Sequence, residues 1–132
     1  MGARTLAFVL FMALPASASA AEVVARIVVQ HSPLAGLRYY DGAALWDEMR
    51  VGDPLTLVRE PDNPHDSNAI RLEWHGRMLG YVPRRENADL ARQMDLGAGA
   101  TGRVVEKIRH RNGGGRLTYE IFVPLTPVSG KR

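Results

Sequence analysis

Cysteine is absent from the 132 residues of this sequence, so no disulfide can stabilise the fold. Stability must come from apolar burial, and the lack of thiols is compatible with a reducing or an oxidising compartment. Lysine is scarce, because fifteen of the seventeen basic residues are arginines. The net charge of +3 is too small to indicate nucleic-acid binding by itself.

No hydrophobic run is long enough to cross a bilayer, which takes about 20 residues. The apolar run 5–14 follows the basic Arg4 and precedes the small residues 16–20, whose last three fit an A-x-A cleavage site. This pattern is typical of a cleavable signal peptide over residues 1–20, with cleavage after Ala20. We therefore expect a periplasmic or secreted protein with no membrane span. An N-terminal membrane anchor is the alternative, which the short run disfavours.

Motifs for catalysis and for metal binding are also missing. No GxSxG, Walker A, HExxH or paired-carboxylate pattern occurs, and the four histidines are scattered. The adjacent His65 and Asp66 form the one candidate pair, and a pair leaves a metal's coordination shell unfilled. We expect no enzymatic activity, no metal and no cofactor. A small extracellular nuclease or phosphatase that uses this pair is the least favoured alternative.

Short β-rich runs separated by turn signals are what the sequence does contain. They lie at residues 23–29, 36–40, 55–59, 69–74, 77–82, 102–109 and 117–123. His75-Gly76 predicts a tight hairpin, residues 45–50 predict one helical turn, and residues 86–96 predict an amphipathic helix that ends before Gly97. These elements predict a mainly β fold with one or two helices, as a small, partly open barrel of about six strands. The domain is expected over residues 21–125, with a flexible tail at 126–132.

The segment 61–70 is the most informative part of the chain. Two prolines, two asparagines and two aspartates occupy eight positions before an apolar run begins. Because proline presets φ and Asx side chains bond nearby backbone N–H groups, we expect a rigid polar loop that leads into a strand. Asp66 either caps this loop or accepts a hydrogen bond from a free terminal hydroxyl, since a carboxylate would repel an internal phosphate.

Arg38, Tyr39 and Tyr40 place a cation beside two aromatic rings. On a regular strand the two tyrosines would point to opposite faces, one into the core and one to solvent. Either both are packing residues, or they form a platform on which bases stack for about 1–3 kcal/mol each. Arg38 would then bind phosphate, or would be a solvated charge.

Together these motifs resemble the HIRAN domain, a module that in the helicase-like transcription factor family grips the end of single-stranded DNA. The resemblance runs from about Gly36 to about Lys107 and is carried by residues 38–40, 57–70 and 79–83. It implies an OB-like barrel of six strands with helices, which agrees with the pattern of β-rich runs.

The resemblance also implies which residues bind nucleic acid. Asp66 falls on the carboxylate that accepts the 3′-hydroxyl, and His65 stands where a tyrosine is often found. The expected set is Arg38, Tyr39, Tyr40, Asn63, His65, Asp66, Tyr81 and Arg84.

The expected function is therefore that of an exported, non-enzymatic module that grips single-stranded DNA at a free 3′-hydroxyl end. The alternative is a cell-envelope protein-interaction or structural module on the same barrel that no longer binds DNA. Export favours this alternative, as does the charge of residues 21–100, which carry nine basic and twelve acidic side chains. Residues 101–132 are the basic end, with seven basic and two acidic side chains.

Overall fold

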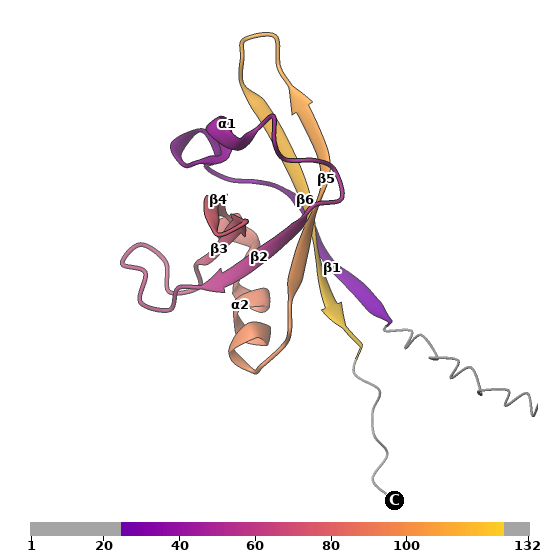
Figure 1. The fold of residues 1–132 in the computed structure, drawn as a ribbon. Helices are drawn as coiled ribbons and strands as arrows, with labels where there is room; N and C mark the ends of the chain where they lie inside the picture. The colour runs from indigo at the N-terminus through magenta and orange to yellow at the C-terminus, as the bar shows by residue number, and fades with distance from the viewer. Residues whose placement is uncertain (1–24, 126–132) are drawn as a thin grey trace, which may run out of the picture.

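The computed structural model describes residues 25–125 (Figure 1). The predicted signal peptide, its cleavage site and the predicted tail at 126–132 lie outside the described residues. Among the described residues, no helix is both long and apolar enough to cross a membrane. The elements follow one another as β1 (Arg26–Pro33), η1 (Leu37–Tyr39), α1 (Gly42–Leu45), β2 (Pro54–Arg59), β3 (Ile70–Trp74), β4 (Arg77–Tyr81), η2 (Arg84–Glu86), α2 (Ala88–Asp95), β5 (Thr101–Arg109) and β6 (Gly115–Pro124), where η marks a 3₁₀ helix.

The strands form a six-stranded sheet in the order β1-β6-β5-β2-β3-β4, and every pairing is antiparallel. β5 and β6 make a long hairpin with β1 beside it, while β2, β3 and β4 follow one another on the other side (Figure 1). The two parts join where Pro54 and Leu55 pair with Arg103 and Gly102. The predicted mainly β fold with six strands and two helices is confirmed.

The two edges of this sheet are joined by a single bridge between Ala35, just after β1, and Tyr81 at the end of β4. The two N···O distances of the bridge are 3.2 and 3.4 Å. Gly80 permits this approach, because its φ is 153° and a Cβ there would lie 2.2 Å from the Ala35 carbonyl oxygen. The sheet is therefore barrel-like, with one bridge in place of a continuous ladder at the seam.

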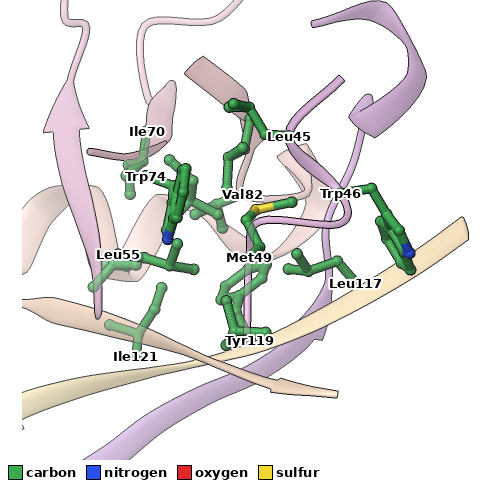
Figure 2. Close-up of a cluster of buried hydrophobic side chains, with 14 of the residues drawn as sticks. Leu45, Trp46, Met49, Leu55, Ile70, Trp74, Val82, Leu117, Tyr119 and Ile121 are labelled. Atoms are coloured by element: carbon green, nitrogen blue, oxygen red, sulfur yellow. The ribbon is translucent and has the colours of Figure 1, made fainter. Parts of the chain in front are cut away.

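The core is formed by side chains of the sheet, of α1 and the residues after it, and of α2; part of it is shown in Figure 2. Buried Ile70, Leu72 and Trp74 alternate with half-buried residues along β3, as the period of two in a strand requires. The indole of Trp74 donates a hydrogen bond of 3.0 Å to Asp53, which satisfies its polar atom. The remaining buried apolar residues of the cluster are Leu45, Trp46, Met49, Leu55, Leu79, Val82, Leu90, Ala91, Val104, Leu117, Tyr119 and Ile121.

The prediction of a strand at 36–40 is wrong, because this segment forms η1. Gly36 has a φ of 86°, which turns the chain, and its carbonyl accepts a hydrogen bond of 2.9 Å from the Tyr39 N–H. Leu37 then packs against the core and lies over Gly42, where a Cβ would be 2.2 Å from its side chain. The turn at Gly36 and the packing of the partly buried Leu37 thus override the β-like composition.

The other local predictions agree better with the structure. His75 and Gly76 have φ values of 47° and 76°, as a tight hairpin turn requires. α2 ends before Gly97, whose φ is 95° and whose N–H bonds the Met94 carbonyl at 2.9 Å. The first helix, however, begins at Gly42, earlier than the predicted turn at 45–50.

Candidate nucleic-acid interface

The loop between β2 and β3 is held by its own asparagine and aspartate side chains. The Asn63 Oδ1 atom accepts the backbone N–H groups of His65 at 2.9 Å and of Asp66 at 3.2 Å. Asp66 Oδ1 in turn accepts the N–H of Asn68 at 2.9 Å. Asp66 therefore caps the loop, which is one of the two roles expected from the sequence.

Two further residues tie this loop to the rest of the barrel. The buried Asn87 donates from Nδ2 to Asp66 Oδ2 at 2.7 Å. Arg59, at the end of β2, donates to the carbonyl oxygens of Ala69 at 2.8 Å and Ser67 at 3.1 Å. Because both ends of the loop are anchored, its side chains are presented in one arrangement before any ligand arrives.

Asp66 is an ionised acceptor in this setting. The side-chain amide of Asn87 and the N–H of Asn68 hold the pKa of Asp66 below its usual value of 3.8, and the charges of Arg84 and Arg59 act in the same direction. A carboxylate offers about four lone-pair sites, and two are occupied here, so a further donor can bind. A lowered pKa also makes Asp66 a poor general base at neutral pH.

Six of the eight predicted residues line one shallow hollow of about 340 Å³. They are Tyr40, Asn63, His65, Asp66, Tyr81 and Arg84. Four of these also line an adjoining, more polar hollow that reaches Asn87 and the start of α2. Arg84 is exposed and forms no ion pair with any described residue. We refer to these two connected hollows as the Asp66 hollow.

The aromatic wall of the Asp66 hollow consists of Tyr40 and Tyr81. Their rings meet edge to face, with centroids 5.9 Å apart. The hydroxyl of Tyr81 donates to both carboxylate oxygens of Glu60, at 3.0 and 3.1 Å, which fixes this ring. Burial, together with the Glu60 carboxylate, raises the pKa of Tyr81 above 10.0, so this hydroxyl stays protonated at neutral pH.

Arg38 and Tyr39 do not line the Asp66 hollow. Their side chains contact each other, with the guanidinium 4.9 Å from the ring centroid and donating to the Tyr39 hydroxyl at 2.9 Å. Arg38 lies within η1, whereas Tyr40 follows it with an extended backbone, and the two side chains line different hollows. The expectation that one of the two tyrosines is buried is wrong, because Tyr39 is 70% exposed and Tyr40 is 38% exposed.

Sequence reasoning missed Asn87, Arg59 and Glu60, which position the predicted residues. Asn87 carried a usable signal, since asparagine just before an amphipathic helix is a typical N-cap, but the helix was predicted to start at Glu86. Arg59 and Glu60 lie within the segment 57–70 that carries the family resemblance, but their residue types did not indicate a positioning role, because charged residues at the end of a strand are common on protein surfaces.

A separate hollow of about 560 Å³ lies between β1 and α2 and contains none of the predicted residues. Apolar Ile27, Val29 and Leu90 line it together with Glu86 and Asp89. Residues 25–125 contain no grouping of three or more histidine, aspartate or glutamate side chains that could hold a metal ion.

Part of the sequence is similar to segments of much longer proteins. The sequence is 43% identical over 61 residues to the helicase-like transcription factor of Oryctolagus cuniculus, a match over 46% of this chain and 6% of that protein. It is 33% identical over 72 residues to a Fanconi-associated nuclease 1 homolog of Oryza sativa subsp. japonica, a match over 52% of this chain and 7% of that protein. The chain thus spans less than a tenth of the length of either relative.

Two solved structures share the fold. A protein from Lactobacillus plantarum superposes with a TM-score of 0.66 at 28% identity, covering 77% of this chain and 98% of that one. The HIRAN domain of human HLTF superposes with a TM-score of 0.61 at 24% identity, covering 77% and 81%. The HIRAN domain sequence model matches residues 27–126, farther in both directions than the resemblance from Gly36 to Lys107. The chain therefore belongs to the HIRAN domain family.

Proposed function

We propose that this protein is a non-enzymatic module that binds single-stranded nucleic acid at a free 3′-hydroxyl end. Membership of the HIRAN family supports nucleic-acid binding in general. The observation that carries the finer proposal is the ionised, anchored Asp66 beside the unpaired Arg84 in one hollow. A cation alone would favour any phosphate, whereas the adjacent carboxylate distinguishes an end from an internal position.

In this mechanism the terminal hydroxyl donates its hydrogen to a free lone pair of Asp66. A terminal phosphate would meet the same carboxylate at short range, and the like charges would repel each other. Arg84, which lines the same hollow, would pair with the phosphate that precedes the terminal sugar. The hollow therefore accepts one negative group and rejects a second.

The terminal base would lie against Tyr40, whose ring is partly exposed and supported by Tyr81. Stacking is independent of base identity, because every base has a π-face, so we expect little sequence preference. His65 offers a smaller aromatic surface on the loop side of the same hollow.

The test is a binding titration with oligonucleotides that differ only in a 3′-hydroxyl, a 3′-phosphate or a 3′-deoxy end. We expect the hydroxyl end to bind about tenfold or more tighter, since a hydrogen bond to a charged group contributes about 1.5–3 kcal/mol. Asp66→Asn should remove most of the discrimination against the phosphate. Asp62→Asn, in the same loop but outside the hollow, is the matched control. Equal affinity for all three ends would contradict end recognition.

We also propose that the protein acts outside the cytoplasm. The signal-like residues 1–20 support export to the periplasm or beyond, where the ligand would be nucleic acid released from cells.

A second candidate function is protein interaction in the cell envelope, and it has one supporting observation. The strand β1 lies at an edge of the sheet and exposes Ile27, Val28 and Val29 beside the hollow next to α2. An edge strand of this kind can take up a strand of another chain. A photo-crosslinker at Val28 that captures one protein in intact cells, and loses it in Val29→Glu, would favour this candidate if nucleic-acid binding is absent.

A further inference from the structure

We propose that a basic hollow on the other side of η1 extends the interface and binds backbone phosphates upstream of the 3′ end. This inference rests on the proposed function of the Asp66 hollow. This basic hollow has a volume of about 140 Å³ and lies between η1, α1 and the turn that joins β5 to β6. Its lining residues are Leu37, Arg38, Ala43, Trp46, Arg109 and Gly113–Gly115.

Positive charge gathers around this hollow and is only partly neutralised. Arg38 is exposed, and no acidic side chain among the described residues pairs with it. Lys107 donates to the backbone carbonyl oxygens of Trp46 and Met49, which hold the ammonium group in place but leave its charge uncompensated. The hollow therefore carries a positive potential that attracts an anion.

Arg109 is the cation of this hollow that can exchange its acidic partner for a phosphate. Its guanidinium lies 5.7 Å from the centroid of the Trp46 ring and pairs with Asp47 at 2.7 Å. Both partners are exposed, with 54% and 91% of the side chain accessible. An ion pair so exposed contributes little to stability, so a phosphate can compete with Asp47 for Arg109. Arg111 is exposed two residues farther along the same turn.

Glycine keeps this surface open and brings the hairpin onto Trp46. A Cβ at Gly115 would lie 2.7 Å from the Trp46 ring, so a larger residue would push the β5–β6 hairpin away from α1. Gly113 and Gly114 present only backbone to the hollow, which leaves room for a polymer to pass.

The two hollows are lined by neighbouring residues of the segment around η1. Tyr40 lines the Asp66 hollow and Arg38, two residues earlier, lines the basic hollow, with the exposed Tyr39 between them. A strand whose 3′ end contacts Asp66 can therefore pass over Tyr39, and its phosphates then meet Arg38 and Arg109. This fixes a polarity, with the 3′ end at Asp66 and the upstream chain at the β5–β6 turn.

The experiment compares an oligothymidylate trimer with a dodecamer, both with a 3′-hydroxyl end, by fluorescence anisotropy at several salt concentrations. In the double variant Arg109→Ala/Arg111→Ala, we expect the dodecamer to bind about tenfold more weakly and the trimer to bind as before. The plot of log K against log salt should become less steep by about 1.4 for the dodecamer, because each lost phosphate contact changes the slope by about 0.7. The double lysine variant should restore most of that slope.

Arg92→Ala is the matched control, since Arg92 is an exposed arginine that pairs with Asp89 on α2 and lines neither hollow. A dodecamer that binds no more tightly than the trimer would overturn the extension, as would an equal loss in Arg92→Ala. Failure of the proposed function has a different signature, because the wild-type trimer would then show no preference for a hydroxyl end.

Discussion

Asn87, which is buried at the start of α2, donates a hydrogen bond of 2.7 Å to the Asp66 carboxylate in the loop before β3. The two residues are 21 positions apart, and β3, β4 and η2 lie between them. The hydrogen bond couples the position of the candidate end-binding carboxylate to the packing of α2. Stability and ligand recognition therefore depend on the same contact.

Replacing Asn87 with alanine should lower the free energy of unfolding by about 1–3 kcal/mol, because Asp66 loses a buried donor. The pKa of Asp66 should rise toward its usual value of 3.8, since the largest cause of its depression is removed. Urea unfolding measures the first effect, and an NMR titration of the carboxyl carbon measures the second. Asn68→Ala is the control, because Asn68 donates through its backbone N–H. Similar losses in both variants would contradict the role of Asn87.

Replacing Gly80 with alanine should open the seam of the barrel. The new Cβ would lie 2.2 Å from the Ala35 carbonyl oxygen, and the φ of 153° is unfavourable for any side chain. We expect a loss of about 2 kcal/mol or more in unfolding free energy. Gly99→Ala is the control, since its nearest neighbour would be Pro124 at an ordinary 3.9 Å. Hydrogen exchange should quicken at Tyr81, whose N–H bonds Ala35. Unchanged exchange there would show that the bridge does not depend on Gly80.

Asp53 should make the fold sensitive to acid. Its carboxylate accepts the Arg50 backbone N–H at 2.8 Å and the Trp74 indole N–H at 3.0 Å, and these bonds lower its pKa below 3.8. A group whose pKa is lowered on folding contributes stability above its unfolded pKa and loses it as the pH falls toward the folded pKa. Asp53→Asn should therefore destabilise the protein at pH 7, and the difference from wild type should shrink below about pH 4.

Urea unfolding followed by tryptophan fluorescence at several pH values measures this difference. Glu48→Gln, at an exposed position after α1, should stay close to wild type throughout. A difference between wild type and Asp53→Asn that is constant from neutral pH to pH 2 would rule out the linkage.

If the protein is exported, its signal peptide should be cleaved after Ala20, and the mature chain should begin at Ala21. When the full sequence is expressed in a bacterium with an intact secretion system, mass spectrometry of the periplasmic fraction should find this N-terminus. Ala18→Lys should block processing, because the A-x-A site needs small residues. A membrane-bound protein that retains Met1 would instead indicate an N-terminal anchor.

Features encoded within a few neighbouring residues were predictable from the sequence. The His75-Gly76 turn, the stop of α2 before Gly97 and the rigid loop around Asp66 depend on φ preferences and on side-chain bonds to nearby N–H groups. The prediction of a strand at 36–40 was wrong because contacts beyond the neighbouring residues determine the conformation there. The packing of the partly buried Leu37 and the positive φ of Gly36 decided its conformation, and local composition predicts neither of them.

The sequence by itself determined the family, the β-rich architecture and six of the residues that meet in the Asp66 hollow. Only the tertiary structure decided that Arg38 faces a different hollow, that Asn87 supports Asp66, and that Gly80 lets Ala35 reach Tyr81. These contacts join segments that are far apart in the chain, so they depend on how the strands and helices pack. Local propensity does not encode them, because the same residues would satisfy other partners in another packing arrangement.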